Sequence, residues 1–164
     1  MVGLALIVVG LRMTDRPAHA NPLLTARTPL SQAQFVHAGN GLCARYYRQI
    51  MPILKSHPKT VRALTRYVRN SIAPMEREAA GLRALIPPRR DAATFQRLLR
   101  VAGQELRETH AILHAFETGQ VRRGVLLARH AGHLDKPYNA LARKIGLSIC
   151  GLTGRQVRAR YGHA

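Results

Sequence analysis

Two histidine pairs have the spacing of metal ligands. His110 and His114 are four residues apart, and His130 and His133 are three apart. Both spacings place the two side chains on one face of a helix, as a zinc site between neighbouring helices would require. The apolar pattern places His110 and His130 beside the buried seam and turns the other two towards solvent. We therefore predict no metal site and keep the four histidines as weak candidates only.

The other patterns that would indicate an enzyme are missing from the sequence. A carboxylate-bridged di-iron bundle needs a histidine three residues after a glutamate, and none of the glutamates has one: Glu76, Glu78, Glu105, Glu108 and Glu117. The sequence also lacks HExxH, CxxC, GxSxG and P-loop motifs. We predict no enzymatic activity, no catalytic residue, no cofactor and no small-molecule substrate.

The acidic residues of the central region have a simpler interpretation. Glu105 and Glu108 are expected on the exposed side of one helix, and Glu76 and Glu78 flank an arginine on another. Asp135 is expected to form a local surface pair with the lysine that follows it. We interpret these acids as part of solvated faces, with pairing at helical spacing that contributes a few tenths of a kcal/mol for each pair.

The net charge is strongly positive. Lysine and arginine number 26 against 8 acidic residues, for a formal charge of +18. A surface this cationic attracts polyanions, which include nucleic acid, anionic lipid and acidic cell-wall polymers. The charge indicates the sign of a partner and leaves its identity open.

The N-terminal region is typical of a secretory signal. Met1–Leu11 is an uninterrupted apolar run that is too short to span a bilayer as a helix. Ala18 and Ala20 form an A-x-A cleavage pattern ahead of Asn21. We predict a signal peptide over 1–20 and a linker over 21–30. No basic residue precedes the run, so the signal is atypical or the start codon lies upstream; an N-terminal anchor or a buried helix is the alternative.

The middle of the chain has helical periodicity. Apolar residues recur at steps of three and four in four stretches: from Ser31 to about Leu54, from Pro58 to Ile86, from the capping Asp91 to Gly119, and from there to Gly146. Short connections between long amphipathic helices favour antiparallel neighbours. The sequence predicts an all-α fold, an antiparallel up-down four-helix bundle over 31–150.

Two cysteines lie at opposite ends of this region. Cys43 falls in the first predicted helix and Cys150 falls just after the last one. First and last helices are neighbours in an up-down bundle, and an even cysteine count in a small exported domain indicates a disulfide. We predict a Cys43–Cys150 bridge that links the first and last helices. Two unpaired thiols in a cytosolic protein are the alternative.

The C-terminal residues 151–164 carry little apolar patterning. We predict a flexible basic tail whose Arg155, Arg158 and Arg160 are candidates for binding a polyanion. The alternative is that the tail is only solvated.

Two short motifs carry a family resemblance. Asn40-Gly41-Leu42-Cys43-Ala44 and Gly146-Leu147-Ser148-Ile149-Cys150-Gly151 resemble the N-x-[IL]-C-A and G-L-x-x-C-G segments of a family of exported actinobacterial helical proteins. The resemblance spans roughly residues 31–151. It implies a signal peptide or lipobox, a helical fold and a paired cysteine, and it brings no established activity. This chain differs in lacking the lipobox and in its very basic charge.

Together these patterns predict a secreted or envelope-located, non-enzymatic helical domain whose cationic surface meets an anionic polymer or a membrane surface. The alternative is a cytosolic helical bundle that binds nucleic acid, with Met1–Leu11 as a buried helix. No helix-turn-helix or RNA-binding motif supports that alternative.

Overall fold

The computed structural model describes residues 28–162, and within that range all regular secondary structure is helical and there is no strand. The predicted all-α class is confirmed. The signal peptide, its cleavage residues Ala18 and Ala20, and most of the linker lie outside the described residues. The elements are α1 (Gln32–Leu54), α2 (Val61–Arg83), the 3-10 turn η1 (Arg89–Asp91), α3 (Ala92–Glu117), α4 (Val121–Ala131), α5 (Asp135–Lys144) and α6 (Gly154–Tyr161).

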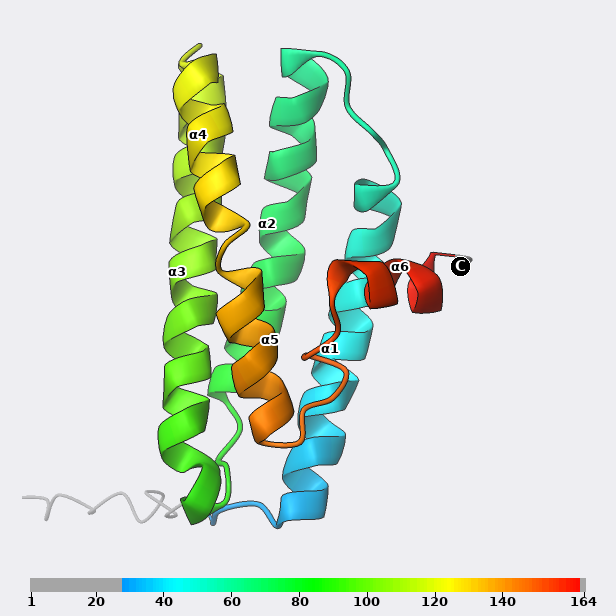
Figure 1. Cartoon of the computed structure of the whole chain (residues 1–164), viewed down its shortest axis with the longest axis vertical. Helices are drawn as coiled ribbons and strands as arrows, with labels where there is room; N and C mark the ends of the chain where they lie inside the picture. The colour runs from blue at the N-terminus through cyan, green and yellow to red at the C-terminus, as the bar shows by residue number, and fades with distance from the viewer. Residues whose placement is uncertain (1–27, 163–164) are drawn as a thin grey trace, which may run out of the picture.

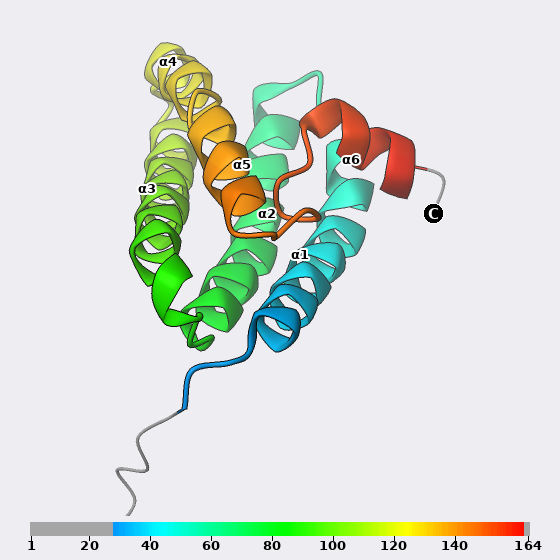
Figure 2. The same cartoon turned by 60° about the horizontal axis from the view of Figure 1, so that its bottom comes forward.

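The three long helices lie side by side, and the shorter ones cover them (Figures 1 and 2). α1 packs on α2, and α2 packs on α3. α4 and α5 follow one another along α3, and both contact it. After α5 the chain crosses to α1, where α6 lies against the middle of that helix.

Local signals explain where the helices begin and end. Ser31 caps α1 in a reciprocal capping box with Gln34, and Thr60 caps α2 by accepting the Ala63 backbone N–H. α3 ends just before Gly119, which has a positive φ of 73°. Glycine adopts this conformation without steric cost, so the predicted helix stop is confirmed.

The core has two parts. The larger cluster contains the most completely buried side chains, and in it Phe35 of α1 meets Phe95 of α3 edge to face with ring centroids 5.1 Å apart. A smaller cluster of Val68, Ile112 and Phe116 lies where α2, α3 and α4 meet. Burial of these apolar groups is the main force that holds the helices together.

The predicted fourth helix is two helices. α4 ends at Ala131 and α5 begins at Asp135, so the disturbance that Pro137 indicates in the sequence is a complete break in the structure. Pro137 explains the break, because a proline ring clashes with the carbonyl group four residues earlier, here His133. As the third residue of α5, Pro137 needs no intrahelical partner for its nitrogen.

The predicted flexible tail is also wrong for most of its length. Residues 154–161 form α6, which starts with a capping box between Thr153 and Gln156. Val157 is buried, and the rings of Tyr47 and Tyr161 lie 5.6 Å apart. The T-x-x-Q sequence at 153–156 is the signal that could have predicted this helix.

The predicted disulfide between Cys43 and Cys150 is present. The two Cα atoms are 5.1 Å apart, and the bridge spans 107 residues of sequence. Cys150 lies in the segment between α5 and α6, so the bridge fastens α1 to that connection. Closing a loop of this length restricts the unfolded chain by about 4–5 kcal/mol in the entropic model.

The two short sequence motifs meet in space around this bridge. The Asn40 side chain accepts the Ile149 backbone N–H at 2.8 Å. Leu147 is fully buried and packs over Gly39, which has no side chain in its way. Gly146 reverses the chain after α5 with a φ of 83°. The motif residues therefore serve to dock residues 145–151 onto α1.

No helix within residues 28–162 has the length and apolar character that crossing a bilayer demands.

The close approach of Leu147 to α1 predicts opposite effects for two neighbouring glycines. A Cβ atom at Gly39 would lie 2.6 Å from Leu147 Cδ2, whereas at Gly41 the nearest atom is the tip of Arg45 at 3.7 Å. Gly39→Ala should destabilise the protein by about 1–3 kcal/mol through overpacking. Gly41→Ala should stabilise it by about 0.5–1 kcal/mol through helix propensity. Urea unfolding measures both, and equal stabilisation by the two would contradict the packing.

Candidate functional site

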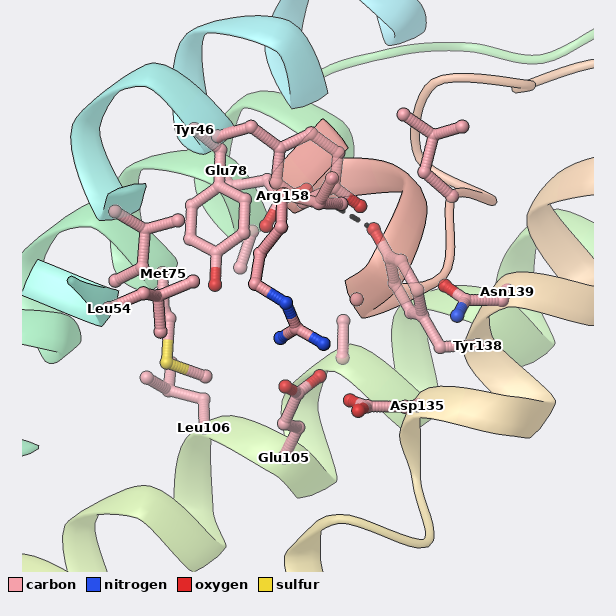
Figure 3. A pocket seen from close by; sticks show the side chains of 17 residues that line it. Tyr46, Leu54, Met75, Glu78, Glu105, Leu106, Asp135, Tyr138, Asn139 and Arg158 are labelled. Carbon is pink, nitrogen blue, oxygen red and sulfur yellow. Dashed lines mark hydrogen bonds between the residues drawn. The ribbon is translucent and has the colours of Figure 1, made fainter. Parts of the chain in front are cut away.

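A hollow within the described residues lies between α1, α2, α3, α5 and α6. It is a cavity of about 250 Å³, which we call the carboxyl pocket. Three acidic side chains border it: Glu78 from α2, Glu105 from α3 and Asp135 from α5. Its other walls include three tyrosines, Tyr46, Tyr47 and Tyr138, and apolar side chains such as Met75 and Leu54. In Figure 3, Tyr46, Glu105, Asp135 and Arg158 point into the same space.

Glu78 is the acid held most firmly. Tyr138 donates a hydrogen bond to its Oε1 at 3.3 Å, and the Cys43 sulfur lies 3.1 Å from the same oxygen. That sulfur carries no hydrogen in the disulfide, so it is a contact and not a donor. Burial and then repulsion from Glu105 raise the pKa of Glu78 to about 8, against a smaller lowering by the Tyr138 bond.

Glu105 is held less firmly. Its side chain is part-buried at the wall of the pocket, and within residues 28–162 no donor forms a hydrogen bond or ion pair with its carboxyl group. Burial, followed by repulsion from Asp135 and Glu108, raises the pKa of Glu105 to about 7. Partial burial also raises the pKa of Asp135, which is exposed at the rim of the pocket.

The expectation of a solvated face is wrong for Glu78 and Glu105. Glu78 follows Met75 by three residues and precedes Leu82 by four. Glu105 has the same relation to Ala102 and Thr109 on the next helix. Residues at these spacings share a helix face, so the apolar seams themselves indicated that both carboxyl groups face the interior.

The arrangement can exchange protons near neutral pH and can hold a positive charge. Two interacting carboxyl groups whose pKa values are near 7 and 8 titrate as a coupled pair. An entering cation would favour the charged form of both. No group of three or more acidic, histidine or cysteine side chains suited to a metal ion is found in the described part of the chain.

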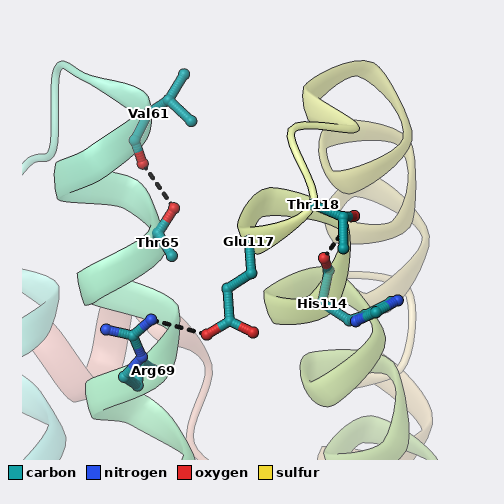
Figure 4. Close-up of polar contacts among 6 residues, drawn as sticks. All are labelled: Val61, Thr65, Arg69, His114, Glu117 and Thr118. Atoms are coloured by element: carbon teal, nitrogen blue, oxygen red, sulfur yellow. Dashed lines mark hydrogen bonds and ion pairs between the residues drawn. The ribbon is translucent and has the colours of Figure 1, made fainter.

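The four candidate histidines lie on exposed surfaces and do not come together as one site. His110 Nε2 lies 3.4 Å from Glu76 on α2, whereas His130 Nε2 lies 3.8 Å from Glu108 on α3. The His130 and His133 rings are 6.4 Å apart. At His114 the backbone carbonyl accepts a hydrogen bond from Thr118 while the imidazole points away from the Arg69–Glu117 ion pair (Figure 4).

Charge is segregated between the inside and the outside of the protein. All 23 lysine and arginine side chains between residues 28 and 162 are exposed, whereas four of the seven acids in that range are at least half-buried: Glu78, Asp91, Glu105 and Glu108. These part-buried acids therefore offset little of the positive charge on the surface. The outer surface is more cationic than the composition alone indicates.

Part of this positive charge is gathered in one surface groove. Arg83 from the end of α2 and Arg97, Arg100 and Arg107 along one face of α3 line it, with Leu141 of α5 at its border. We call it the arginine groove. Among residues 28–162, no acidic side chain forms an ion pair with any of these four arginines.

The three candidate arginines of the predicted tail lie on α6 and differ in surroundings. Arg158 borders the carboxyl pocket, Arg160 lies 5.9 Å from the centre of the Tyr161 ring, and Arg155 is exposed to solvent. Their role as a polyanion-binding set stays a prediction.

Comparison with known proteins adds no family to this description. No protein-family model matches the chain, and no curated protein or solved structure shows significant similarity to it.

The raised carboxyl pKa values predict that stability depends on pH. Between the ordinary pKa of 4.5 and the folded value of about 8, the folded protein retains a proton on Glu78 that the unfolded chain loses. This contribution is fully present below about pH 4.5 and is lost as the pH rises to about 8. The urea concentration at the midpoint of unfolding should therefore fall between pH 4.5 and about 8 in the wild type, and Glu78→Gln should reduce this fall. An exposed control on the same helix, Glu76→Gln, should keep the slope; identical slopes for wild type and Glu78→Gln would contradict the burial.

Proposed function

We propose that the protein is an exported, non-enzymatic helical domain that binds anionic polymers of the cell envelope through its cationic surface, with the arginine groove as the principal contact. The observation that carries this proposal is the gathering of Arg83, Arg97, Arg100 and Arg107 in one groove without acidic partners among the described residues.

The chemistry of the groove favours phosphate or carboxylate groups. Guanidinium groups present paired N–H donors that match the geometry of these anions and bind them bidentately. Gln96 and Gln104 line the same groove and supply further donors. An extended polymer can engage several arginines along α3 at once, and the repeat of charge then raises its affinity.

The expected location is also supported by the covalent structure. A disulfide persists in oxidising compartments outside the cytosol, and Cys43 and Cys150 form one. Cleavage of a signal peptide after Ala20 and the resemblance to exported actinobacterial proteins belong to the same proposal. We also infer an up-down bundle in which α4 and α5 together take the place of a fourth helix, which is supported by the packing of α1 on α2, of α2 on α3 and of both α4 and α5 on α3.

A matched pair of triple variants tests the groove. The first carries Arg97→Gln, Arg100→Gln and Arg107→Gln; the control carries Arg45→Gln, Arg48→Gln and Arg122→Gln at exposed positions elsewhere. Binding to inorganic polyphosphate is measured by titration at several salt concentrations. We expect the groove variant to bind at least 10-fold more weakly and with a shallower salt dependence, because fewer counterions are released. The control should change affinity less than 3-fold.

The other anionic partners are separate arms of this experiment. Vesicles that contain an anionic phospholipid and double-stranded DNA are titrated under the same conditions. Equal losses in both triple variants would show diffuse charge and contradict the groove. Tighter binding to vesicles or to DNA than to polyphosphate would contradict a polymer of the envelope as the partner, and no salt-sensitive binding to any of them would contradict the proposed function as a whole.

A further inference from the structure

The carboxyl pocket adjoins a second hollow with a different lining. This hollow of about 500 Å³ lies between α1, α2, α3 and α4, and we call it the apolar hollow. Its walls include Leu64, Val68, Ile112 and Phe116. Six residues line both hollows: Tyr46, Ile50, Leu54, Met75, Glu105 and Asp135. The two spaces therefore share a wall, and Glu105 stands where they meet.

The fold itself leaves this space open. α4 turns away after Ala131 and α5 resumes only at Asp135, so the layer over α3 is interrupted at Gly132–Leu134. Gly132 and Asp135 both line the apolar hollow.

The carboxyl pocket and the apolar hollow together form what we call the composite cavity. Glu105 is an acidic side chain in it that has no partner among the described residues. Its side chain is part-buried, points into the cavity (Figure 3) and has no hydrogen-bond donor or ion-pair partner among the described residues. Partial burial without a partner favours the protonated form of a carboxyl group, and a cation in the cavity would favour the charged form. Glu78 differs in this respect, because it already accepts a hydrogen bond from Tyr138.

We propose that the composite cavity binds an organic cation that carries an apolar chain, with the cationic group at Glu105 and Glu78 and the chain in the apolar hollow. A primary alkylamine is the simplest ligand of this class. Its ammonium group would meet two carboxyl groups and the ring faces of tyrosines, which attract cations. Its chain would pack against Leu64, Val68 and Phe116, and the chain itself would gain from leaving water.

The charges around the cavity decide the sign of the ligand. Glu78, Glu105 and Asp135 line the carboxyl pocket. Arg158 points its guanidinium group into the same space (Figure 3) without forming an ion pair with any of these acids. Three carboxyl groups therefore face one guanidinium group in this pocket, whereas Arg129 is exposed at the border of the apolar hollow. An anionic ligand would have to place its charge beside the internal carboxyl groups. The net charge of +18 also repels free cations from the outer surface, so binding of an amine reports the cavity and not the surface.

Binding should depend on pH through the carboxyl groups. The ionisable groups that border the composite cavity come from every helix around it: Tyr46, Tyr47, Tyr67, Glu78, Glu105, Arg129, Asp135, Tyr138 and Arg158. Of these, Glu105 and Glu78 have pKa values of about 7 and about 8. An ammonium group displaces their protons, so its affinity should rise between pH 6 and pH 8 and protons should be released on binding.

Titration calorimetry on the full chain tests the proposal with n-octylamine as the probe. We expect saturable binding with proton release, and an affinity that falls roughly 3- to 4-fold for each methylene removed from the chain. Glu105→Gln keeps the shape of the side chain and should weaken n-octylamine binding at least 10-fold. Glu117→Gln changes the charge equally on an exposed part of α3 and should leave the affinity unchanged.

Neutral and anionic probes of the same length complete the test. We expect n-octanol to bind more weakly than n-octylamine and to be insensitive to Glu105→Gln, and octanoate not to bind. Octanoate or n-octanol binding as tightly as the amine would overturn the assignment of a cation. Loss of chain-length dependence would overturn the role of the apolar hollow.

Circular dichroism of each variant confirms that it is folded. The polyphosphate titration, whose ligand has the opposite charge, separates this proposal from the proposed function.

Discussion

The disulfide between Cys43 and Cys150 is the constraint on which the rest of the structure depends. It fastens the segment after α5 to the middle of α1 across 107 residues of sequence. Arg143 Nη1 donates to the Gly151 carbonyl at 2.6 Å, and Tyr47 donates to the Cys150 carbonyl at 3.3 Å, so local bonds set the same path. Because this segment leads into α6, the bridge also places Val157 and Arg158 at the wall of the carboxyl pocket.

The distribution of charge gives the protein a cationic exterior and a cavity that is lined by carboxyl groups. The exterior is cationic because every described lysine and arginine is exposed, whereas Glu78 and Glu105 face inward. Buried carboxyl groups weaken a fold when they ionise, and a protein that needed only stability would fill their positions with apolar side chains. Retaining them beside an open cavity is consistent with a role in binding, as functional sites often conserve groups whose pKa values are perturbed by burial.

The sequence predicted the features that follow from local rules. The Ser31 cap, the stop at Gly119 and the disulfide could be inferred because each depends on one or two residues of known preference. The other two predicted starts differ, since Asp91 makes no capping bond with its side chain and α2 begins at Val61 instead of Pro58. Pro137 indicated a disturbance in the predicted fourth helix, but the apolar pattern continues through Leu134 and Tyr138 and did not indicate a complete break between α4 and α5. The tail was assigned by its charge, although its capping box and Val157 indicated a helix.

The candidate site was harder to predict than the fold. The spacing of Glu78 and Glu105 within their apolar seams was visible, but a glutamate at such a position is normally solvated at the edge of a bundle. Its burial here depends on how α5 packs on α3 and α6 packs on α1, which is a matter of tertiary packing. The arginine groove likewise joins residues of α2 and α3 that are well separated in sequence.

The most direct test of the disulfide and of export uses protein that is produced by its own cell, and it determines the state of the two cysteines. Intact mass is measured after alkylation with and without reductant. We predict that neither cysteine is alkylated before reduction, that both are alkylated after it, and that the chain begins at Asn21. Two reactive thiols without reductant on a chain that retains residues 1–20 would contradict both the bridge and the export of the protein.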